Sequence, residues 1–515
     1  MPVSFSFSFP FSVGPANARR NRDIASPLWS ADTGITKCLS VVWLIALLFS
    51  VPALAVADDA TPPNIVLIVA DDLGWNAVGY HEGFAKTPNI DRIARRGVQL
   101  DKFYVSPMCS PTRAGIMTGR YPIRFGMART VVRPWADFGL PPNERMLPER
   151  LAEVGYEHRG AFGKWHLGHL RPEWHPLTQG FTEFKGHYNG AEDYWTHDRE
   201  GENDWHVDDE PLDEPLDEPG YQTGLVGDAA ANFITGHAGD DSPYFVYVPF
   251  MAPHAPMQAP QERIDAQPAF ASKDKRILSA MIGELDDIVG KLMNAIDASG
   301  EAENTLVIFM SDNGGVGNIP GNNKPLKGSK LTAWEGGIRV PAAAWWPGHI
   351  EGGRTIDTPL INLDWLPTLL AAGGRPIDDD VDGKNALPLL IGEAESLPPR
   401  DLYYYHGQNG PDAEWLAMRS ADGWKLVIHG PDVRTDGWES ARHDVALFKI
   451  DDDPNEQNRI ESSHPDIVRA LGEKLLKFRQ LQPEDATGAP NQMSADFKIP
   501  PQWRNPLPTN RPRAP

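Results

Sequence analysis

Short runs of β-branched and other apolar residues recur along the chain, and each run stops at a polar cluster. The strongest runs span residues 64–70, 244–248 and 305–310, and a weaker run lies at 157–162. A continuous apolar run of this length is typical of a strand that is buried on both faces of a sheet. The four runs therefore predict central strands with polar side chains at their carboxyl ends.

Helical patterns separate these strands. Residues 87–97 begin with Thr87 as a cap and Pro88 at the first helical position, and residues 273–298 place apolar side chains on one face. Strands that alternate with helices predict an α/β fold with a large, mainly parallel sheet flanked by helices. Such sheets bind ligands beyond the carboxyl ends of their strands, which is where the polar clusters fall.

The pattern changes after residue 394. Short apolar runs at 417–419, 424–428 and 446–450 predict antiparallel strands, and residues 467–481 predict an amphipathic helix. A smaller C-terminal α+β subdomain is therefore expected.

The expected domain organisation has four parts. We expect a leader with a signal peptide over 1–57, a catalytic domain over 58–394, the smaller subdomain over 395–499 and a proline-rich tail over 500–515. The acidic, proline-rich repeat at 208–220 predicts a solvated loop.

The leader predicts export. An apolar run at 39–59 follows basic residues and contains small side chains at Ala55 and Ala57, which is typical of a secretory signal cleaved near Ala57. An uncleaved membrane anchor is the alternative, although the run is short for a membrane span. Cleavage gives a periplasmic or secreted protein without stable membrane contact.

Charge and cysteine content narrow the function further. The formal net charge of −22 argues against nucleic acid or an anionic membrane as a partner, so an anionic substrate needs a local basic site. Cys38 is lost with the leader, which leaves Cys109 without a disulfide partner in an exported chain. A buried apolar role is common for a free thiol, but this context favours chemistry.

Polar side chains follow two of the strongest predicted strands. Asp71 and Asp72 come directly after the first strand, and Asp312 and Asn313 end the run that begins at residue 305. Such residues are common in turns. Carboxylates brought together repel one another unless a cation lies between them, and oxygen ligands suit calcium or magnesium. Both pairs follow strongly apolar strands, which favours a metal site.

Four basic side chains occupy comparable loop positions: Lys164, His166, His254 and Lys330. The histidines can act as acid or base near neutral pH, and the lysines can hold an anion. Each alone is compatible with a surface or core role. Together with a cation they describe a site for a small tetrahedral oxyanion ester.

Cys109 precedes a predicted helix. Residues 110–112 can cap and start this helix, which would place the positive end of its dipole at Cys109 and favour a bound anion. A cysteine-dependent phosphatase requires arginine six positions after its cysteine, whereas here Arg113 is four positions on and Gly115 is the sixth. An unmodified thiolate nucleophile therefore fits poorly.

Residues 109–121, CSPTRAGIMTGRY, resemble the signature of the type I sulfatases, whose Cys-x-Pro-x-Arg cysteine is oxidised to Cα-formylglycine. Similarity runs from about residue 63 to at least 460. The resemblance implies an alkaline-phosphatase-like fold and a sulfuric ester hydrolase. Further motifs follow in the family's order: Asp71-Asp72, residues 163–168, His254, residues 312–315, residues 330–337 and residues 453–456.

This resemblance also implies a cofactor, a mechanism and a maturation enzyme that generates formylglycine. The hydrated aldehyde at residue 109, as a geminal diol, would attack sulfur and form a covalent sulfate ester, and its second hydroxyl would then expel sulfate. Calcium, with magnesium the less favoured ion, would be held by residue 109 and by four side chains: Asp71, Asp72, Asp312 and Asn313.

The remaining roles follow from the same resemblance. Arg113 and Lys164 would hold the formylglycine hydroxyls. His166 would take the proton that triggers sulfate release. His254 and Lys330, together with Lys164, would bind the substrate, and His254 would be the general acid for the departing alcohol.

The segments MLPE at 146–149 and EDYWTH at 192–197 resemble the arylsulfatase B branch, which includes N-acetylgalactosamine-4-sulfatases. The expected substrate is therefore a sulfated sugar of that kind, another polysaccharide-derived sulfate or an aryl sulfate. The mature chain lacks the disulfide cysteines of the branch's animal members. Trp195 and His197 are candidates for a sugar subsite, and packing or loop roles are the alternative.

Two other functions remain open at this point. A phosphonate or phosphate diester hydrolase can share this fold and sometimes the same modified cysteine. A non-catalytic, calcium-stabilised carbohydrate-binding protein would use its tryptophans as sugar platforms.

Overall fold

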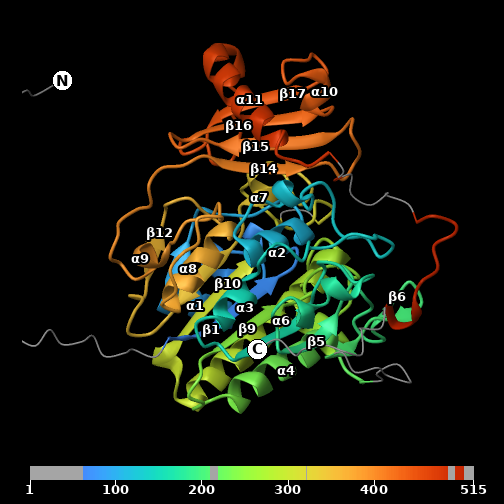
Figure 1. Cartoon of the computed structure of the whole chain (residues 1–515), viewed down its shortest axis with the longest axis vertical. Helices are drawn as coiled ribbons and strands as arrows, with labels where there is room; N and C mark the ends of the chain where they lie inside the picture. Colours follow the sequence, from blue (N-terminus) through green and yellow to red (C-terminus); the bar gives the residue numbers. More distant parts are fainter. Residues whose placement is uncertain (1–61, 209–217, 320–321, 485, 487–492, 504–515) are drawn as a thin grey trace, which may run out of the picture. The chain divides into compact units, whose positions relative to one another are not determined.

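A nine-stranded mixed sheet forms the centre of the protein (Figure 1). Its strands, in chain order, are β1 (Asn64–Ala70), β2 (Val98–Leu100), β4 (His158–Lys164), β5 (Glu183–His187), β8 (His206–Val207), β9 (Tyr244–Pro249), β10 (Thr305–Ser311), β11 (Ala342–Trp345) and β12 (Arg354–Ile356). Their order across the sheet is β12-β2-β11-β10-β1-β9-β4-β5-β8. The five neighbouring strands from β10 to β5 are parallel, whereas β11 and β8 run antiparallel to their neighbours. The predicted mainly parallel sheet is confirmed.

This computed structural model describes residues 62–208, 218–319, 322–484, 486 and 493–503. The expected leader with its cleavage site, most of the acidic repeat and the end of the proline-rich tail lie outside these residues. Within the described ranges, no helix combines the length and apolar character needed to cross a membrane.

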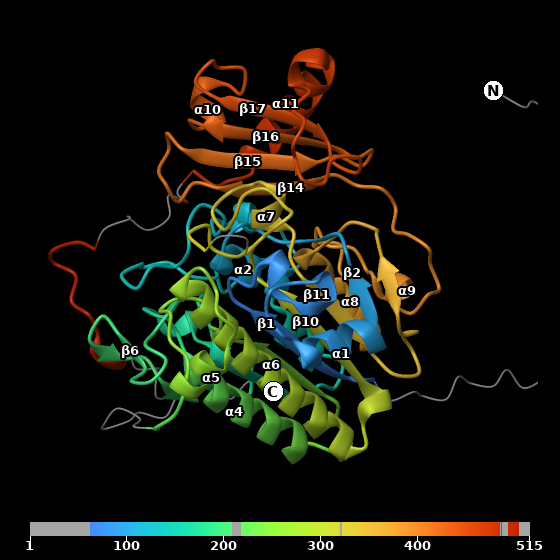
Figure 2. The same ribbon diagram turned by 180° about the vertical axis from the view of Figure 1, so that it is seen from behind.

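Helices pack on both faces of the sheet. They are α1 (Pro88–Arg96), α2 (Cys109–Thr118), α3 (Leu147–Ala152), α4 (Gln222–Gly236), α5 (Gln261–Ala266), α6 (Lys273–Ser299), α7 (Glu335–Ile338), α8 (Trp365–Ala372) and α9 (Leu387–Leu390). Ile65 and Leu67 of β1 pack in a core with α2, α3 and α8, whereas Val66 and Ile68 pack in a second core with α1, α4 and α6. Figure 2 shows α4 and α6 side by side on the second face. Alternation along β1 thus explains its continuous apolar run.

The strand predicted at 157–162 is β4, which begins one residue later and ends two residues later. β4 continues to Lys164 because Gly163 and Lys164 pair with the glycine and histidine at the end of β5. Glycine and buried lysine are poor strand signals, so the pattern could not locate this end.

The start of α1 also differs from expectation. Thr87 occupies the cap position, but its hydroxyl donates to Asp91 Oδ1 (2.9 Å) instead of capping the helix. The carboxylate of Asp286 on α6 accepts hydrogen bonds from the backbone N–H groups of Asn89 and Ile90. The helix is capped by its packing partner, which no local pattern reveals.

The C-terminal part forms the predicted antiparallel sheet, in the order β14-β15-β16-β17 (Figure 1). Its strands are β14 (Leu402–His406), β15 (Glu414–Arg419), β16 (Trp424–Gly430) and β17 (Asp444–Lys449), and its helices are α10 (Val433–Asp436) and α11 (Pro465–Arg479). Leu471 and Leu475 of α11 pack on one face of this sheet. Ala417 and Val427 on the other face pack with Ile338 of α7, which joins the two sheets through α7. The exact boundary at 394/395 stays a prediction.

Four short strands form two further pairs. β3 (Phe103–Tyr104) pairs in parallel with β13 (Leu360–Ile361), and β6 (Asp198–Arg199) pairs with β7 (Glu202–Asn203).

Candidate active site

The candidate metal ligands come together because β1 and β10 are parallel neighbours whose last residues are paired. The next residues are Asp71 and Asp72 on one strand and Asp312 and Asn313 on the other. The backbone N–H of Asp72 lies 3.4 Å from Asp312 Oδ1, and the side chains of all four residues are buried. The structure therefore brings the four side chains together, and their role as metal ligands stays a prediction.

Arg113 ties helix α2 to this cluster. Its guanidinium donates from Nε to Asp312 Oδ2 (3.0 Å), from Nη2 to Asp71 Oδ2 (3.1 Å) and from Nη1 to the carbonyl oxygen of Lys164 (2.7 Å). The ammonium group of Lys164 donates to the same oxygen of Asp71. Arg113 and Lys164 thus hold the carboxylates directly, and their expected contacts to hydroxyls on residue 109 stay a prediction.

Asp72 organises the other side of the site. Its Oδ1 accepts hydrogen bonds from Lys330 Nζ (2.6 Å) and Asn313 Nδ2 (2.6 Å). Its Oδ2 lies 3.7 Å from His254 Nε2. Lys330 and His254 come from loops far apart in sequence, so a single carboxylate places both basic groups at the end of β1.

Cys109 is buried and is the first residue of α2. The expected cap at residues 110–112 is wrong, because Met108 is the residue before the helix and no side chain caps it. Ser110 instead donates from its hydroxyl to the carbonyl oxygen of His166 (2.9 Å) and accepts from the N–H of Val132 (3.1 Å). Its hydroxyl therefore fixes the loop that carries His166.

His166 occupies a tight position. Its backbone has φ of +57°, and its Nε2 lies 2.9 Å from the carbonyl oxygen of Val132. Its Nδ1 is buried and has no hydrogen-bond partner among the described residues. Gly190 packs against the imidazole, since a Cβ there would come within 2.5 Å of His166 Cε1. One nitrogen is thus anchored and the other is available to exchange a proton.

Burial changes the protonation of the reactive groups. It raises the pKa of the Cys109 thiol, which keeps an unmodified thiol protonated. Burial, with the charge of Lys330 next, lowers the pKa of His254 to about 4. Burial, followed by the charge of Lys164, holds the pKa of His166 well below its usual value. Both imidazoles are therefore neutral at neutral pH unless a bound anion favours their protonation.

The two central carboxylates behave differently. Burial opposes charge on Asp71, but Lys164, His254 and Arg113 lower its pKa overall. Burial and the neighbouring charge of Asp71 raise the pKa of Asp312 to about 7. A cation between them would remove this repulsion and favour the ionised form of Asp312.

The residues present fit a divalent cation of the oxygen-loving class. Asp71 Oδ1 and Asn313 Oδ1 are buried without hydrogen-bond partners among the described residues. Unpartnered buried oxygens are costly, so each needs a ligand. Ligand atoms of Asp71, Cys109 and Asp312 also lie within 4.8 Å of one another. A carboxylate- and amide-rich set suits calcium or magnesium.

The two candidate sugar-binding residues lie in different environments. Trp195 is 44% exposed, with its ring centroid 5.2 Å from that of Tyr221. His197 is buried, with its ring stacked on Trp205 and its Nδ1 3.6 Å from Glu192 Oε1. Trp195 is open to a ligand, while the contacts of His197 are those of a packed residue. Their substrate-binding roles stay predictions.

Sequence reasoning missed Tyr194 as a positioning residue. Its hydroxyl donates to the backbone carbonyl oxygen of His254 (2.9 Å), and its ring stacks on Tyr221. Tyr194 lies in the EDYWTH segment that was noted for its resemblance, but only the folded chain brings it to residue 254.

A buried ion cluster supports the loop that carries Lys330. Lys425 of β16 contacts Glu335 Oε1 (2.8 Å) and Glu456 Oε1 (2.7 Å), and Glu456 Oε2 accepts from the backbone N–H of Glu335. Tyr104 donates to the second oxygen of Glu335. The C-terminal sheet thus holds the start of α7, five residues after Lys330.

Comparison with protein families identifies the class. Residues 63–374 match the family model described as "Sulfatase", and residues 329–481 match the one described as "N-sulphoglucosamine sulphohydrolase, C-terminal". The chain therefore belongs to the sulfatase family. It is a sulfuric ester hydrolase, as its resemblance to the type I sulfatases implied.

Individual similar proteins support the same class. The chain is 35% identical over 427 residues to the N-acetylgalactosamine-6-sulfatase of Canis lupus familiaris, covering 78% of each chain. It is 32% identical over 457 residues to arylsulfatase J of Mus musculus, covering 81% of this chain and 76% of that protein. A solved structure of Ps i-CgsB in complex with k-i-k-neocarrahexaose superposes with a TM-score of 0.74 at 30% identity, covering 82% of this chain and 94% of that chain. The alkaline-phosphatase-like architecture is thereby confirmed.

Proposed function

We propose that the protein hydrolyses sulfate monoesters carried by sugars, with Cys109 matured to Cα-formylglycine and with a bound calcium ion. The observation that carries the proposal is the burial of Cys109 beside unpartnered oxygens of Asp71 and Asn313. A family cysteine with a raised thiol pKa is a poor nucleophile, so a matured side chain explains its position better.

The side chains that would hold the cation are residue 109, Asp71, Asp72, Asp312 and Asn313. Calcium is favoured over magnesium because it accepts a site made almost entirely of protein oxygens, whereas magnesium retains water ligands. The hydrated aldehyde would supply an oxygen nucleophile, and the bound cation would polarise the sulfuryl oxygens.

The charge balance supports an anionic substrate. Three aspartates and three basic side chains meet in the site, so the protein groups are close to neutral as a set. A divalent cation makes this set positive, and a sulfate monoester then restores balance. Arg113, Lys164 and Lys330 provide the local basic region that the acidic chain requires.

Two imidazoles are placed to handle protons. His166 is anchored through Nε2 and can accept a proton at Nδ1, which suits the base that assists sulfate release. His254 approaches Asp72 through Nε2, and its Nδ1 contacts the carbonyl oxygen of Ala255. A bound sulfate raises the pKa of His254 from about 4, which lets it protonate the departing alcohol.

Sugar sulfates are the proposed substrates. One similar protein is named N-acetylgalactosamine-6-sulfatase, and the similar structure of Ps i-CgsB holds k-i-k-neocarrahexaose. The exposed ring of Trp195 offers a surface on which a sugar can stack. The proposed substrates include sugars sulfated at position 4 and at other positions. We also propose export through the leader and maturation by a formylglycine-generating enzyme.

Parallel assays test this proposal. Sulfate release from sulfated mono- and oligosaccharides is measured beside hydrolysis of aryl sulfate and aryl phosphodiester, with calcium present and after chelation. We expect calcium-dependent release from at least one sugar sulfate and background release by Cys109→Ala. Faster phosphodiester cleavage, or full activity in Cys109→Ala, would overturn the proposal.

A further inference from the structure

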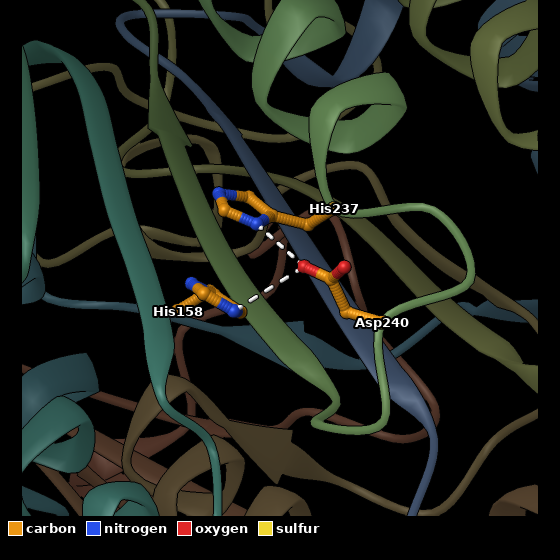
Figure 3. A group of neighbouring side chains, drawn as sticks. All are labelled: His158, His237 and Asp240. Atoms are coloured by element: carbon orange, nitrogen blue, oxygen red, sulfur yellow. Dashed lines mark hydrogen bonds and ion pairs between the residues drawn. The ribbon is translucent and has the colours of Figure 1, made fainter.

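A second cluster of potential metal ligands lies at the opposite end of β4 from Lys164. His158 is the first residue of β4, His237 follows the last residue of α4, and Asp240 lies in the loop from α4 to β9. Figure 3 shows the two imidazoles converging on one carboxylate oxygen. His237 Nδ1 lies 3.0 Å and His158 Nε2 lies 3.3 Å from Asp240 Oδ2.

Both ring nitrogens of His237 face carboxylates. Its Nδ1 faces Asp240, and its Nε2 faces Glu183 Oε1 at 3.5 Å. A neutral imidazole carries one N–H, so it cannot donate to two carboxylates at once. Either an additional proton or a metal ion at Nδ1 resolves this conflict. With a metal at Nδ1, the Nε2–H donates to Glu183, the arrangement in which a carboxylate orients a metal-binding histidine.

Carboxylates surround the cluster. Burial and then the charge of His237 lower the pKa of His158, which favours the neutral imidazole that binds a metal, and the nearby carboxylates of Asp240, Glu157 and Glu183 favour a cation at the cluster. The C-terminal end of α4 adds the negative end of its dipole beside His237. Solvent reaches the cluster through a cavity of about 590 Å³ lined by residues that include His158 and Asp240. A hydrated ion can therefore enter.

The surrounding backbone is held in place. The N–H of Gly239 donates to Glu301 Oε1 (2.7 Å), and the hydroxyl of Ser242 accepts from the N–H of Glu157 (3.0 Å) while it donates to the carbonyl oxygen of Gly155 (2.7 Å). These bonds fix the loop that carries Asp240 against the start of β4. The ring centroids of the two imidazoles lie 3.8 Å apart, so both rings are already beside the carboxylate of Asp240.

We propose that His158, His237 and Asp240 form a binding site for a divalent transition metal of the zinc class, with Glu183 positioning His237. A set of two imidazoles and one carboxylate suits zinc, nickel or copper better than it suits calcium. The ligand atoms lie within 4.8 Å of one another, and the cavity leaves room for water to complete the coordination. The ion would fasten the end of α4 to the start of β4.

Calorimetric titration of the calcium-saturated enzyme with Zn²⁺ tests the site, with a parallel titration in the Cys109→Ala protein to remove the thiol. We expect one equivalent to bind in both proteins. His158→Ala and His237→Ala should each lose that equivalent. His349→Ala is the matched control, because it removes an exposed imidazole stacked on Trp346, and it should bind zinc as the wild type does.

Two conservative variants keep the test valid if an alanine variant folds poorly. Asp240→Asn retains a hydrogen-bond acceptor for the imidazoles and should lose most of the zinc affinity. Glu183→Gln retains an acceptor for His237 Nε2 and should weaken binding about 10-fold. Zinc should also raise the Tm of the wild type but not that of Asp240→Asn. Absence of saturable binding in the wild type, or unchanged stoichiometry in His237→Ala or Asp240→Asn, would overturn the proposal.

Discussion

Two buried clusters of charged residues differ in whether a cation contacts the oxygens that have no hydrogen-bond donor. At the end of β1 and β10, Asp71 Oδ1 and Asn313 Oδ1 have no partner among the described residues. At the junction with the C-terminal sheet, Lys425 lies between Glu335 and Glu456 and contacts an oxygen of each. Burying polar groups without partners is costly. The first cluster is therefore incomplete without a ligand, whereas the second is a structural joint.

Substitution of Cys109 should abolish activity without destabilising the fold. Cys109→Ala should reduce sulfate release to background while leaving the Tm close to that of the wild type, because a small buried side chain replaces a small buried thiol. Lys425→Met should instead lower the Tm clearly, because it removes a buried cation that contacts two carboxylates. Sulfate release and thermal unfolding are measured on both variants. An active Cys109→Ala enzyme would contradict the assignment of the first cluster to catalysis.

Asp312→Asn tests the incomplete cluster directly. The pKa of Asp312 is raised to about 7, so its ionised form is disfavoured when no cation is bound, although the carboxylate also accepts a hydrogen bond from buried Arg113. Calcium-dependent turnover should fall at least about 100-fold, because a metal ligand that stabilises developing charge is lost. Asp382→Asn is the matched control, as Asp382 pairs with Arg124 outside the site. An Asp312→Asn enzyme with normal turnover would remove Asp312 from the metal set.

Lys425→Met tests the structural joint. Removing Lys425 leaves two buried carboxylates without their cation, so we expect a loss of about 3–5 kcal/mol in the free energy of unfolding. The control is Lys102→Met, which breaks a partly exposed pair with Asp451 and should cost about 0–1 kcal/mol. Denaturant unfolding measures both. Equal losses of unfolding free energy in the two variants would show that the buried ion cluster around Lys425 stabilises the protein no more than a partly exposed ion pair does.

Calcium should stabilise the folded protein through the first cluster only, and the expected gain in the free energy of unfolding is small. At a concentration of about 100 times its Kd, a ligand that binds only the folded state adds about 2.7 kcal/mol. The wild type and Lys425→Met should both gain this increment, whereas Asp312→Asn should gain much less. Unfolding curves with and without calcium give the comparison. A calcium response that disappears in Lys425→Met would mean that the two clusters are coupled.

Apolar patterning predicted the strands that build the site, because each central strand is buried on both faces and ends at a polar cluster. Parallel pairing of β1 and β10 then brings Asp71 and Asp312 together, which is a consequence of topology that the sequence suggests. The motifs that resemble the family located Cys109 and the basic residues.

Contacts made across the fold could not be predicted. Asp286 caps α1 from another helix, and Lys425 reaches Glu335 from the C-terminal sheet. The approach of His158 to His237, 79 residues later, depends on how α4 packs beside β4. Such contacts depend on side chains that meet only after folding, and no periodicity or local spacing encodes them.

The mass of the proteolytic peptide that contains residue 109 shows directly whether Cys109 is converted to formylglycine. We interpret the first cluster as the site of this aldehyde beside a cation. Conversion of the Cys109 side chain from CH2–SH to CHO lowers the peptide mass by about 18 Da. We expect this shift in protein produced with a formylglycine-generating enzyme, with sulfate release proportional to the converted fraction. Full activity in protein whose peptide retains the cysteine mass would contradict it.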